Sequence, residues 1–223
     1  MQQFIDGFFN LAILERTWWY VLQGFGMTLQ LCLVVVPVGL AGGLAVALVG
    51  TARRRWLRWL VIAYVDFFRA FPPLVLLIFV YFGMPFAGLD LSPFAAVVIG
   101  FLLNTSSYYG EIFRAGIESI GRGQYEAARS TGLSGLETMA WIVVPQAVRN
   151  VVPDLISNTL EVVKLTSIAS VVALPELLFA ARSAQSLTYN ATPIVLAAFC
   201  YLALLWPVVR LMSRLEHRML VRH

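Results

Sequence analysis

Five stretches of the chain stay apolar for about 20 residues or more, the length that an α-helix needs to cross a bilayer. They cover residues 27–50, 59–82, 94–113, 151–174 and 193–212. The first has no charged residue, whereas the second contains Asp66 and Arg69 and the fourth contains Asp154, Glu161 and Lys164. Buried core helices are the alternative, but no polar segment is large enough to cover them. The pattern predicts an all-α membrane protein with five transmembrane helices in a single domain over 1–223.

A polar segment of about twenty residues separates the third stretch from the fourth. Residues 126–129 read Glu-Ala-Ala-Arg, which are good helix formers, and Gly132 follows where such a helix would stop. Ser134 and Glu137 have the spacing of a capping box that starts a second helix, and Pro145 is expected to end it. Two capped helices in a membrane loop predict a docking element. The alternative is an amphipathic loop lying on the membrane surface.

The composition agrees with a membrane protein and the charges orient it. The chain is 60% hydrophobic, its mean hydropathy is +0.80 and its net charge is +4. Twelve of its sixteen Lys and Arg residues lie in connections that the order of the spans puts on one side of the membrane, namely 51–58, 114–150 and the tail from Arg210. Only Arg16 and Arg182 lie in connections on the opposite side. By the positive-inside rule the N-terminus is outside, and the C-terminus and the 114–150 loop are cytoplasmic. The basicity therefore reflects orientation and does not point to nucleic acid.

Several motifs together point to one family. The residues concerned are Glu126-Ala127-Ala128, Gly132, Ile142, Pro145-Gln146-Ala147, the run from Glu111 to Ile117, Gly123-Gln124, Pro153, the run from Lys164 to Ile168, and the early Gly24 and Thr28. This set, which covers essentially the whole chain, resembles the permease subunits of ATP-binding cassette (ABC) importers, in the branch that moves polar amino acids. Two positions depart from the family pattern. Leu165 replaces an acidic residue, and 69–73 read Arg-Ala-Phe-Pro-Pro, both in the membrane region where substrate would be met.

The resemblance implies partners and a role for the polar segment. That segment would be the coupling helix pair, and the residues assigned to ATPase coupling are Glu126, Ala127, Ala128, Arg129 and Gly132. The chain has no G-x-x-x-x-G-K-[ST] motif, so ATP and Mg would sit on a separate ATPase subunit. The family also implies a second permease copy or paralogue, a solute-binding protein outside, and the bacterial cytoplasmic (inner) membrane. The chain itself would be a transporter subunit with no catalytic residue.

Polar residues at membrane depth suggest where substrate passes. At 1.5 Å per residue they lie about 15–20 Å from the membrane surface, near the midplane. The candidates are Arg69, Asn104, Thr105, Glu161, Lys164, Thr166 and Ser167. In this hypothesis Arg69 or Lys164 meets the carboxylate of a zwitterion and Glu161 meets its ammonium group. Alternatively, Asp66–Arg69 and Glu161–Lys164 neutralise each other at i,i+3 spacing.

Other candidate chemistry is sparse. Glu111 and Arg114 are expected to be interface or gating residues, and Pro72-Pro73 would release carbonyl groups from the helix at the same depth. Two histidines in the tail, His217 and His223, have no partner at metal-ligand spacing, so no metal site is expected. A secondary, ion-coupled transporter is the alternative function. A membrane enzyme is disfavoured because histidine occurs only in the tail.

Overall fold

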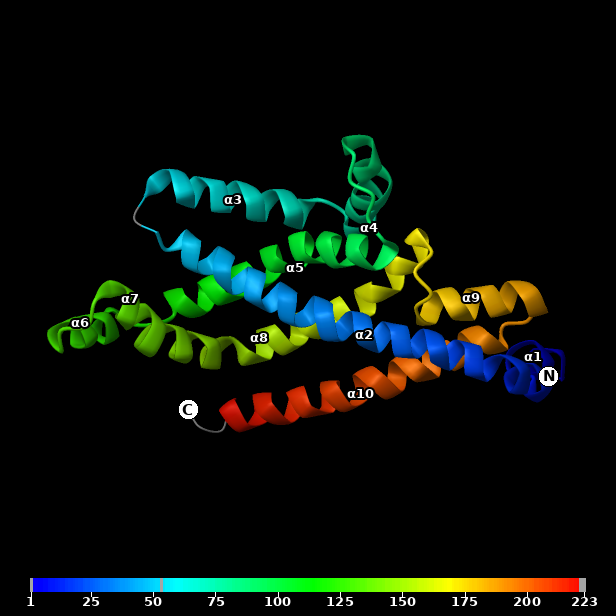
Figure 1. The fold of residues 1–223 in the computed structure, drawn as a ribbon. Coiled ribbons are helices and arrows are strands. Elements are labelled where there is room, and N and C mark those ends of the chain that lie inside the picture. Colours follow the sequence, from blue (N-terminus) through cyan, green and yellow to red (C-terminus); the bar gives the residue numbers. More distant parts are fainter. Residues whose placement is uncertain (1, 53, 221–223) are drawn as a thin grey trace. The chain divides into compact units, whose positions relative to one another are not determined.

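The computed structural model describes residues 2–52 and 54–220, and of 211–220 the backbone alone. Every regular element in this part of the chain is helical (Figure 1). The elements are α1 (Gln2–Phe8), α2 (Leu11–Gly50), α3 (Arg55–Ala70), α4 (Pro73–Ile78), the π-helix η1 (Phe79–Gly83), the 3₁₀-helix η2 (Met84–Ala87), α5 (Pro93–Glu118), α6 (Arg122–Ser130), α7 (Gly135–Glu137), the π-helix η3 (Thr138–Val143), α8 (Val144–Leu165), the 3₁₀-helix η4 (Thr166–Val172), α9 (Leu177–Thr188) and α10 (Thr192–Leu220).

Some of the residues that entered the charge and metal arguments are not described. Arg53, Arg222 and His223 lie outside the described residues, and for Arg214, His217 and Arg218 only the backbone is described. The chain divides into two compact units. The first contains residues 1–36, 73–101 and 160–223, and the second contains 37–72 and 102–159.

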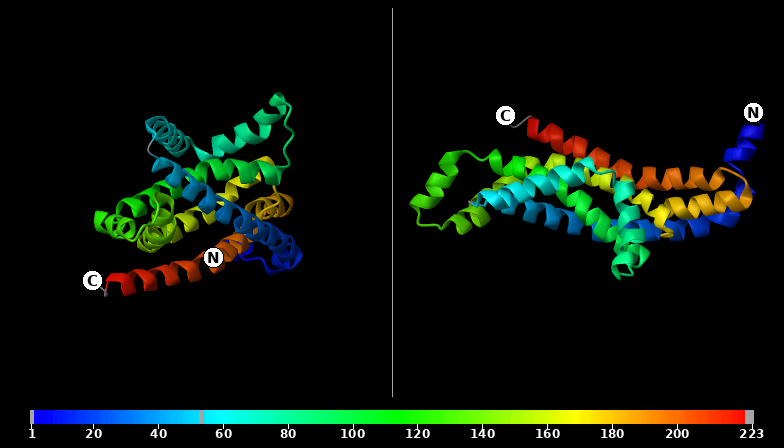
Figure 2. Two further views of the ribbon diagram at one scale, coloured as in Figure 1. Left: turned by 60° about the vertical axis from the view of Figure 1, so that its left-hand side comes forward. Right: turned by 90° about the horizontal axis from the view of Figure 1, so that it is seen from above.

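The first unit has a small apolar core where α2, α9 and α10 meet. Val21, Leu177, Ala181 and Ala197 are all buried there. α9 and α10 lie side by side in antiparallel directions (Figure 2). Gly24 makes the close approach of α2 possible, because a β-carbon at this position would lie 2.7 Å from Cβ of Ala180. The early Gly24 of the sequence motif is therefore a helix-packing residue.

The second unit is held by polar bonds between its helices. Tyr64 of α3 bonds to Ser106 of α5 at 2.7 Å between their hydroxyl oxygens. Tyr109 of α5 bonds to Thr159 of α8 at 2.8 Å. In a membrane protein the lipid gives helices little hydrophobic reason to associate, so such bonds help to hold them together.

Three helical runs of the described residues are long and apolar enough to cross a membrane: Gln2–Gly50, Gly135–Val172 and Thr192–Arg210. α3 and α4 would make a fourth span only as a bent pair, so the second predicted span is broken and not continuous. The predicted third span is a 26-residue helix, α5, whose polar middle lowers its hydropathy. The fold is that of a multi-pass helical membrane protein, and the count of five stays a prediction.

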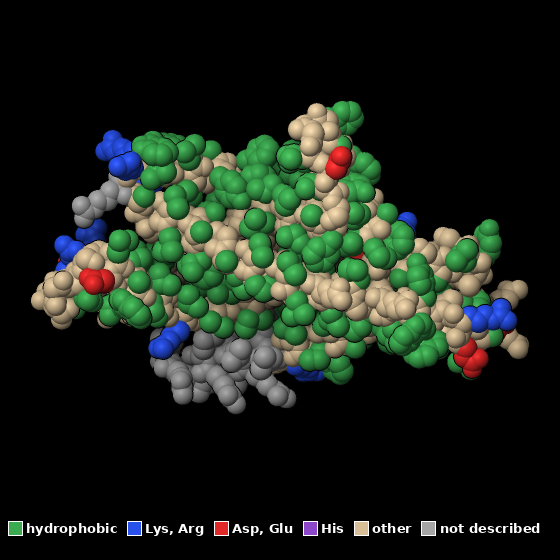
Figure 3. Space-filling model, in the orientation of Figure 1, with side chains coloured by type: hydrophobic (Ala, Val, Ile, Leu, Met, Phe, Trp, Pro, Cys, Tyr) green, Lys and Arg blue, Asp and Glu red, His purple; other side chains and the backbone are tan. Residues whose placement is uncertain are grey.

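Large apolar side chains cover much of the face drawn in Figure 3, and charged side chains are few on it. Leu33 is 75% exposed, Trp59 70% and Phe199 57%. A soluble protein seldom exposes apolar surface on this scale, so these side chains suit contact with lipid.

The prediction that Pro145 ends the second helix of the polar segment is wrong. α7, η3 and α8 follow one another without a break from Gly135 to Leu165, and Pro145 is the second residue of α8. Inside a continuous helical run a proline removes one N–H and its ring crowds the preceding turn, so the helix must depart locally from α-geometry. The π-turns of η3 just before it provide the local irregularity that such a position needs.

Candidate functional site

The predicted helix–glycine–helix segment is present, and both of its helix ends are capped. Gly132 has φ of +87°, its N–H donates to the carbonyl of Arg129 at 3.1 Å, and the N–H of Leu133 donates to the carbonyl of Ala128 at 3.3 Å. This is a Schellman motif, which closes the end of α6. The Ser134 hydroxyl then accepts from the Glu137 N–H at 3.3 Å, and the Glu137 carboxylate accepts from the Ser134 N–H at 2.8 Å. The capping box is confirmed.

Three of the predicted coupling residues face outward on α6. Glu126, Ala127 and Arg129 are exposed, whereas Ala128 is buried inside the chain's own unit. α6 lies beside η3. The segment therefore offers a short polar helix whose inner face is fixed and whose outer face is free for a partner.

The break between α3 and α4 is compensated by side chains of α5. Pro72 and Pro73 lack the N–H groups that, at i–4 spacing, would bond the carbonyls of Phe68 and Arg69. Asn104 Nδ2 donates to the Phe68 carbonyl at 3.1 Å instead. Tyr108 has the same relation to Arg69: its hydroxyl donates to that carbonyl at 3.3 Å. The two missing backbone donors are thus replaced, one for one, by two side chains that are one helical turn apart.

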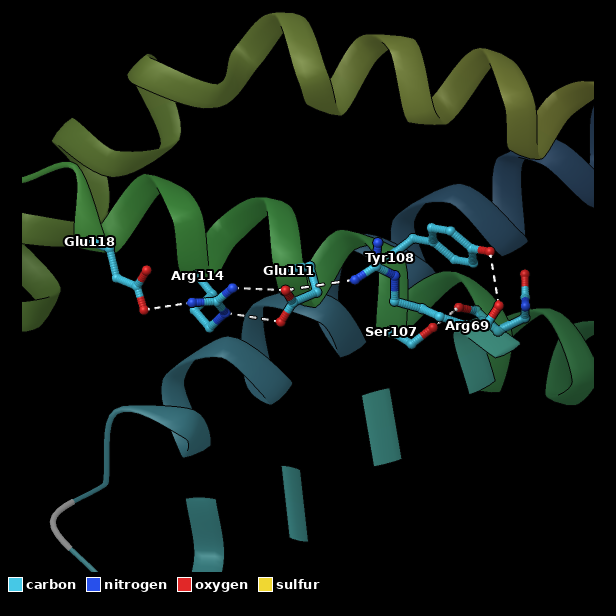
Figure 4. A network of polar contacts seen from close by, with 7 residues as sticks. Arg69, Ser107, Tyr108, Glu111, Arg114 and Glu118 are labelled. Carbon is cyan, nitrogen blue, oxygen red and sulfur yellow. Dashed lines mark hydrogen bonds and ion pairs between the residues drawn. The ribbon is translucent and has the colours of Figure 1, made fainter. Parts of the chain in front are cut away.

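A row of charged residues continues along α5 from this point (Figure 4). Arg114 holds Glu111 through two bonds, of 2.9 and 2.8 Å, and reaches Glu118 at 2.6 Å. Arg69 of α3 lies 3.7 Å from the Glu111 carboxylate, and its guanidinium stacks 5.5 Å from the centre of the Tyr108 ring. Arg69 therefore pairs with the neighbouring helix. The Asp66–Arg69 pair of the alternative interpretation is not among the ion pairs of the described residues.

The candidate substrate residues fall into both units. Arg69, Asn104 and Thr105 belong to the second, and Glu161, Lys164, Thr166 and Ser167 belong to the first. Thr105 is buried, and a β-carbon at Gly39 would lie 3.2 Å from its Cβ, so it is a packing residue of α5 against α2. Lys164 and Glu161 form an ion pair with each other, as the alternative interpretation held. Thr166 and Ser167 donate to the carbonyls one turn back.

One buried charged residue was missed by the sequence reasoning. Glu176 is fully buried and caps α9: its carboxylate accepts from the N–H groups of Leu178 (2.8 Å) and Phe179 (2.7 Å) and from the Tyr201 hydroxyl (3.2 Å). Thr28 Oγ1 accepts from the N–H of Leu177 at 3.0 Å. Burial raises the pKa of Glu176 above its ordinary value, although these bonds act in the opposite direction. An acidic residue one position before an apolar helix was the available signal.

Residues 39–221 match the family described as "Binding-protein-dependent transport system inner membrane component". The chain belongs to this family. As a family member, this permease is a transporter subunit of the ABC importer class, and it resembles amino-acid permeases along almost its whole length. It is 36% identical over 197 residues to the probable amino-acid ABC transporter permease protein YckA of Bacillus subtilis strain 168, covering 88% of this chain and 87% of that one. It is also 36% identical over 211 residues to the probable glutamine ABC transporter permease protein GlnM of the same organism, covering 94% and 98%.

Solved structures agree on the fold. A crystal structure of an amino acid ABC transporter with histidines matches the permease with a TM-score of 0.82 and 32% identity, over 93% of this chain and 97% of that one. An inward-facing structure of the MetNI methionine ABC transporter matches with a TM-score of 0.76 over 92% and 98%, at 20% identity, which supports the fold alone. The sequence-based assignment to amino-acid ABC permeases is confirmed.

Proposed function

We propose that the permease carries a polar amino acid inward across the cytoplasmic membrane, driven by ATP hydrolysis on a separate subunit that docks on α6. The observation that carries this proposal is the doubly capped segment, where a Schellman motif ends α6 and a capping box starts the next helical run. A helix that transmits force to a partner must keep its ends folded. These caps satisfy backbone groups that would otherwise lack hydrogen-bond partners at the end of α6 and at the start of the next helical run.

The exposed side chains of α6 suit a protein partner. Glu126 and Arg129 carry opposite charges on a solvent-facing surface, so they can pair with complementary charges and set the register of docking. The positive-inside pattern predicts that this segment is cytoplasmic, on the side where ATP is available. A second permease copy or paralogue, and a solute-binding protein outside, complete the assembly in this proposal.

Disulfide crosslinking tests the docking. With Cys32 and Cys200 replaced by Ser, single cysteines are placed at positions 126, 127 and 129 of α6 and at exposed Asp90 as a control. Crosslinks to cysteines in the ATPase are expected from α6 and not from position 90. If α6 gives none in vesicles that transport, the docking proposal is wrong.

Energy coupling has its own test, because the alternative is an ion-coupled carrier. Uptake of labelled L-glutamine is measured in proteoliposomes of the assembled transporter. Uptake should require ATP inside the compartment that faces α6 and should persist when an ionophore removes the proton gradient. Uptake that does not depend on ATP and is abolished by the ionophore would support the secondary transporter instead.

A further inference from the structure

A cavity of about 360 Å³ opens in the second unit between α3 and α5. Its size is within the range of small-molecule sites. Val61, Ile62 and Val65 of α3 supply apolar lining, and Gly50 closes the edge at the end of α2. The other lining residues are all charged: Arg58, Asp66, Glu111, Arg114 and Glu118.

The charges on the α5 wall are already satisfied. Arg114 is bonded to Glu111 and Glu118 by three bonds of 2.6–2.9 Å. Arg69 adds a second cation beside Glu111. Arg69 belongs to α3 and does not itself line the cavity. With it, Glu111, Arg114 and Glu118 form a group of two carboxylates and two guanidiniums, which Figure 4 shows in one row.

By contrast, the charged residues of α3 that line the cavity have no ion-pair partner among the described residues. Arg58 and Asp66 are exposed, and neither forms an ion pair with any residue that the structure describes. They are eight residues apart, about 12 Å along the helix axis, so a small molecule fits between them better than a direct pair does. A charge on a membrane helix normally faces water or a partner. One unpaired cation and one unpaired anion on the same wall complement a ligand that carries both charges and no net charge.

Building on the proposed function, we infer that this cavity is a binding site for an α-amino acid with an uncharged side chain, in which Arg58 receives the carboxylate and Asp66 the ammonium group. The ion-paired group of Glu111, Arg114, Glu118 and Arg69 has no net charge, so a ligand with a charged side chain gains no unpaired partner there. Neither residue was a candidate from the sequence alone, where Arg58 counted only toward orientation and Asp66 only as a partner for Arg69. The site makes the cavity a specificity filter within the permease.

Equilibrium binding of labelled L-glutamine tests this inference. The complete transporter, this chain with its ATPase, is placed in lipid nanodiscs without the solute-binding protein, so that only sites within the complex bind. Asp66→Asn and Arg58→Gln should each raise the dissociation constant about tenfold or more, because each removes a charge-assisted contact. Asp90→Asn and Arg182→Gln make the same chemical changes at exposed positions outside the cavity and should leave binding unchanged. Basal ATPase activity is the check that each variant is folded and assembled.

Two results overturn the inference. One is a change of less than threefold in either cavity variant. The other is wild-type protein that binds L-arginine more than tenfold more tightly than L-glutamine, since that would mean an acidic site. Failure of the proposed function is a separate outcome: wild-type proteoliposomes would then show no ATP-driven uptake of glutamine, whatever the binding measurements give.

Discussion

Replacing Asn104 by Leu should destabilise the permease by leaving a carbonyl without a donor. Asn104 is 3% exposed and donates to the Phe68 carbonyl at 3.1 Å. Leu has a similar size but no N–H group, so the substitution removes the donor without leaving an empty cavity in the core. The backbone cannot supply a substitute, because the residue that would donate to Phe68 in a continuous helix is Pro72.

The size of the destabilisation follows from the Phe68 carbonyl, which would be left without a hydrogen-bond donor. A buried acceptor that loses its partner costs about 1–3 kcal/mol. For a chain of this length about 1 kcal/mol shifts the melting temperature by roughly 2–4 °C. The Asn104→Leu protein should therefore melt about 2–12 °C below wild type. Tyr108→Phe should shift it less, because the bond of its hydroxyl to Arg69 is longer, at 3.3 Å, and more exposed.

A second substitution separates this cause from general damage to the core. Pro72→Ala restores an N–H at position 72 and frees Phe71, now extended at ψ of 127°, to become helical. The N–H of Ala at 72 can then bond the Phe68 carbonyl, so in this background the cost of Asn104→Leu should nearly disappear. Pro73→Ala is the matched control. Its N–H is in register with Arg69 and not with Phe68, and it should not rescue Asn104→Leu.

The assay is thermal unfolding of the purified, full-length protein in one detergent, for wild type, the three single variants and the two double variants. A coupling of about 1 kcal/mol or more is expected between positions 104 and 72, and less than about 0.5 kcal/mol between 104 and 73. Equal rescue by both alanines, or rescue by neither, would refute the reasoning that the side chain replaces the missing backbone donor.

Three other substitutions have defined outcomes. Gly132→Ala forces a β-carbon into a left-handed conformation at φ of +87° and should cost about 1 kcal/mol, seen as faster amide exchange at Leu133. Ser134→Ala removes a helix cap and should also cost about 1 kcal/mol, while Ser134→Thr keeps the hydroxyl and should not. Glu176→Gln tests the raised pKa of this carboxyl: wild-type stability should fall as the pH rises from 4.5 through the higher folded value, because the folded state holds the proton more tightly, and the variant should lack this slope in melting temperature against pH.

Short-range sequence patterns correctly predicted the structure of the polar segment. Gly132 and the Ser134–Glu137 pair were expected to end one helix and to start the next, and both motifs are present. These features depend on residues within five positions of one another, so the sequence contains the whole cause. Pro145 was misjudged for the opposite reason. Whether a proline ends a helix depends on the turn before it. Here that turn is a π-helix, which no residue pattern predicted.

Pairings between distant segments were not predictable in the same way. Asp66 is three residues from Arg69, and the spacing alone favoured that pair. The structure brings Glu111 to Arg69 instead, and the two are 42 positions apart. Glu176 was passed over because 175–192 looked like a plain connection between spans. Its role depends on α9, a helix that packs on α10 and on α2, which is distant in the sequence.

One face of α5 explains how the second unit uses its polar residues. Positions 104, 108, 111 and 118 recur at helical spacing, so they point toward the same side. At one end, Asn104 and Tyr108 satisfy backbone carbonyls released by the prolines. At the other, Glu111 and Glu118 line the cavity and are held by Arg114. Substitutions at the first end should therefore change stability before ligand affinity, whereas those on the facing wall of the cavity should change affinity with little effect on stability. The α5 face thus replaces the missing backbone donors of α3 at one end, and at the other it forms the cavity wall that faces Arg58 and Asp66.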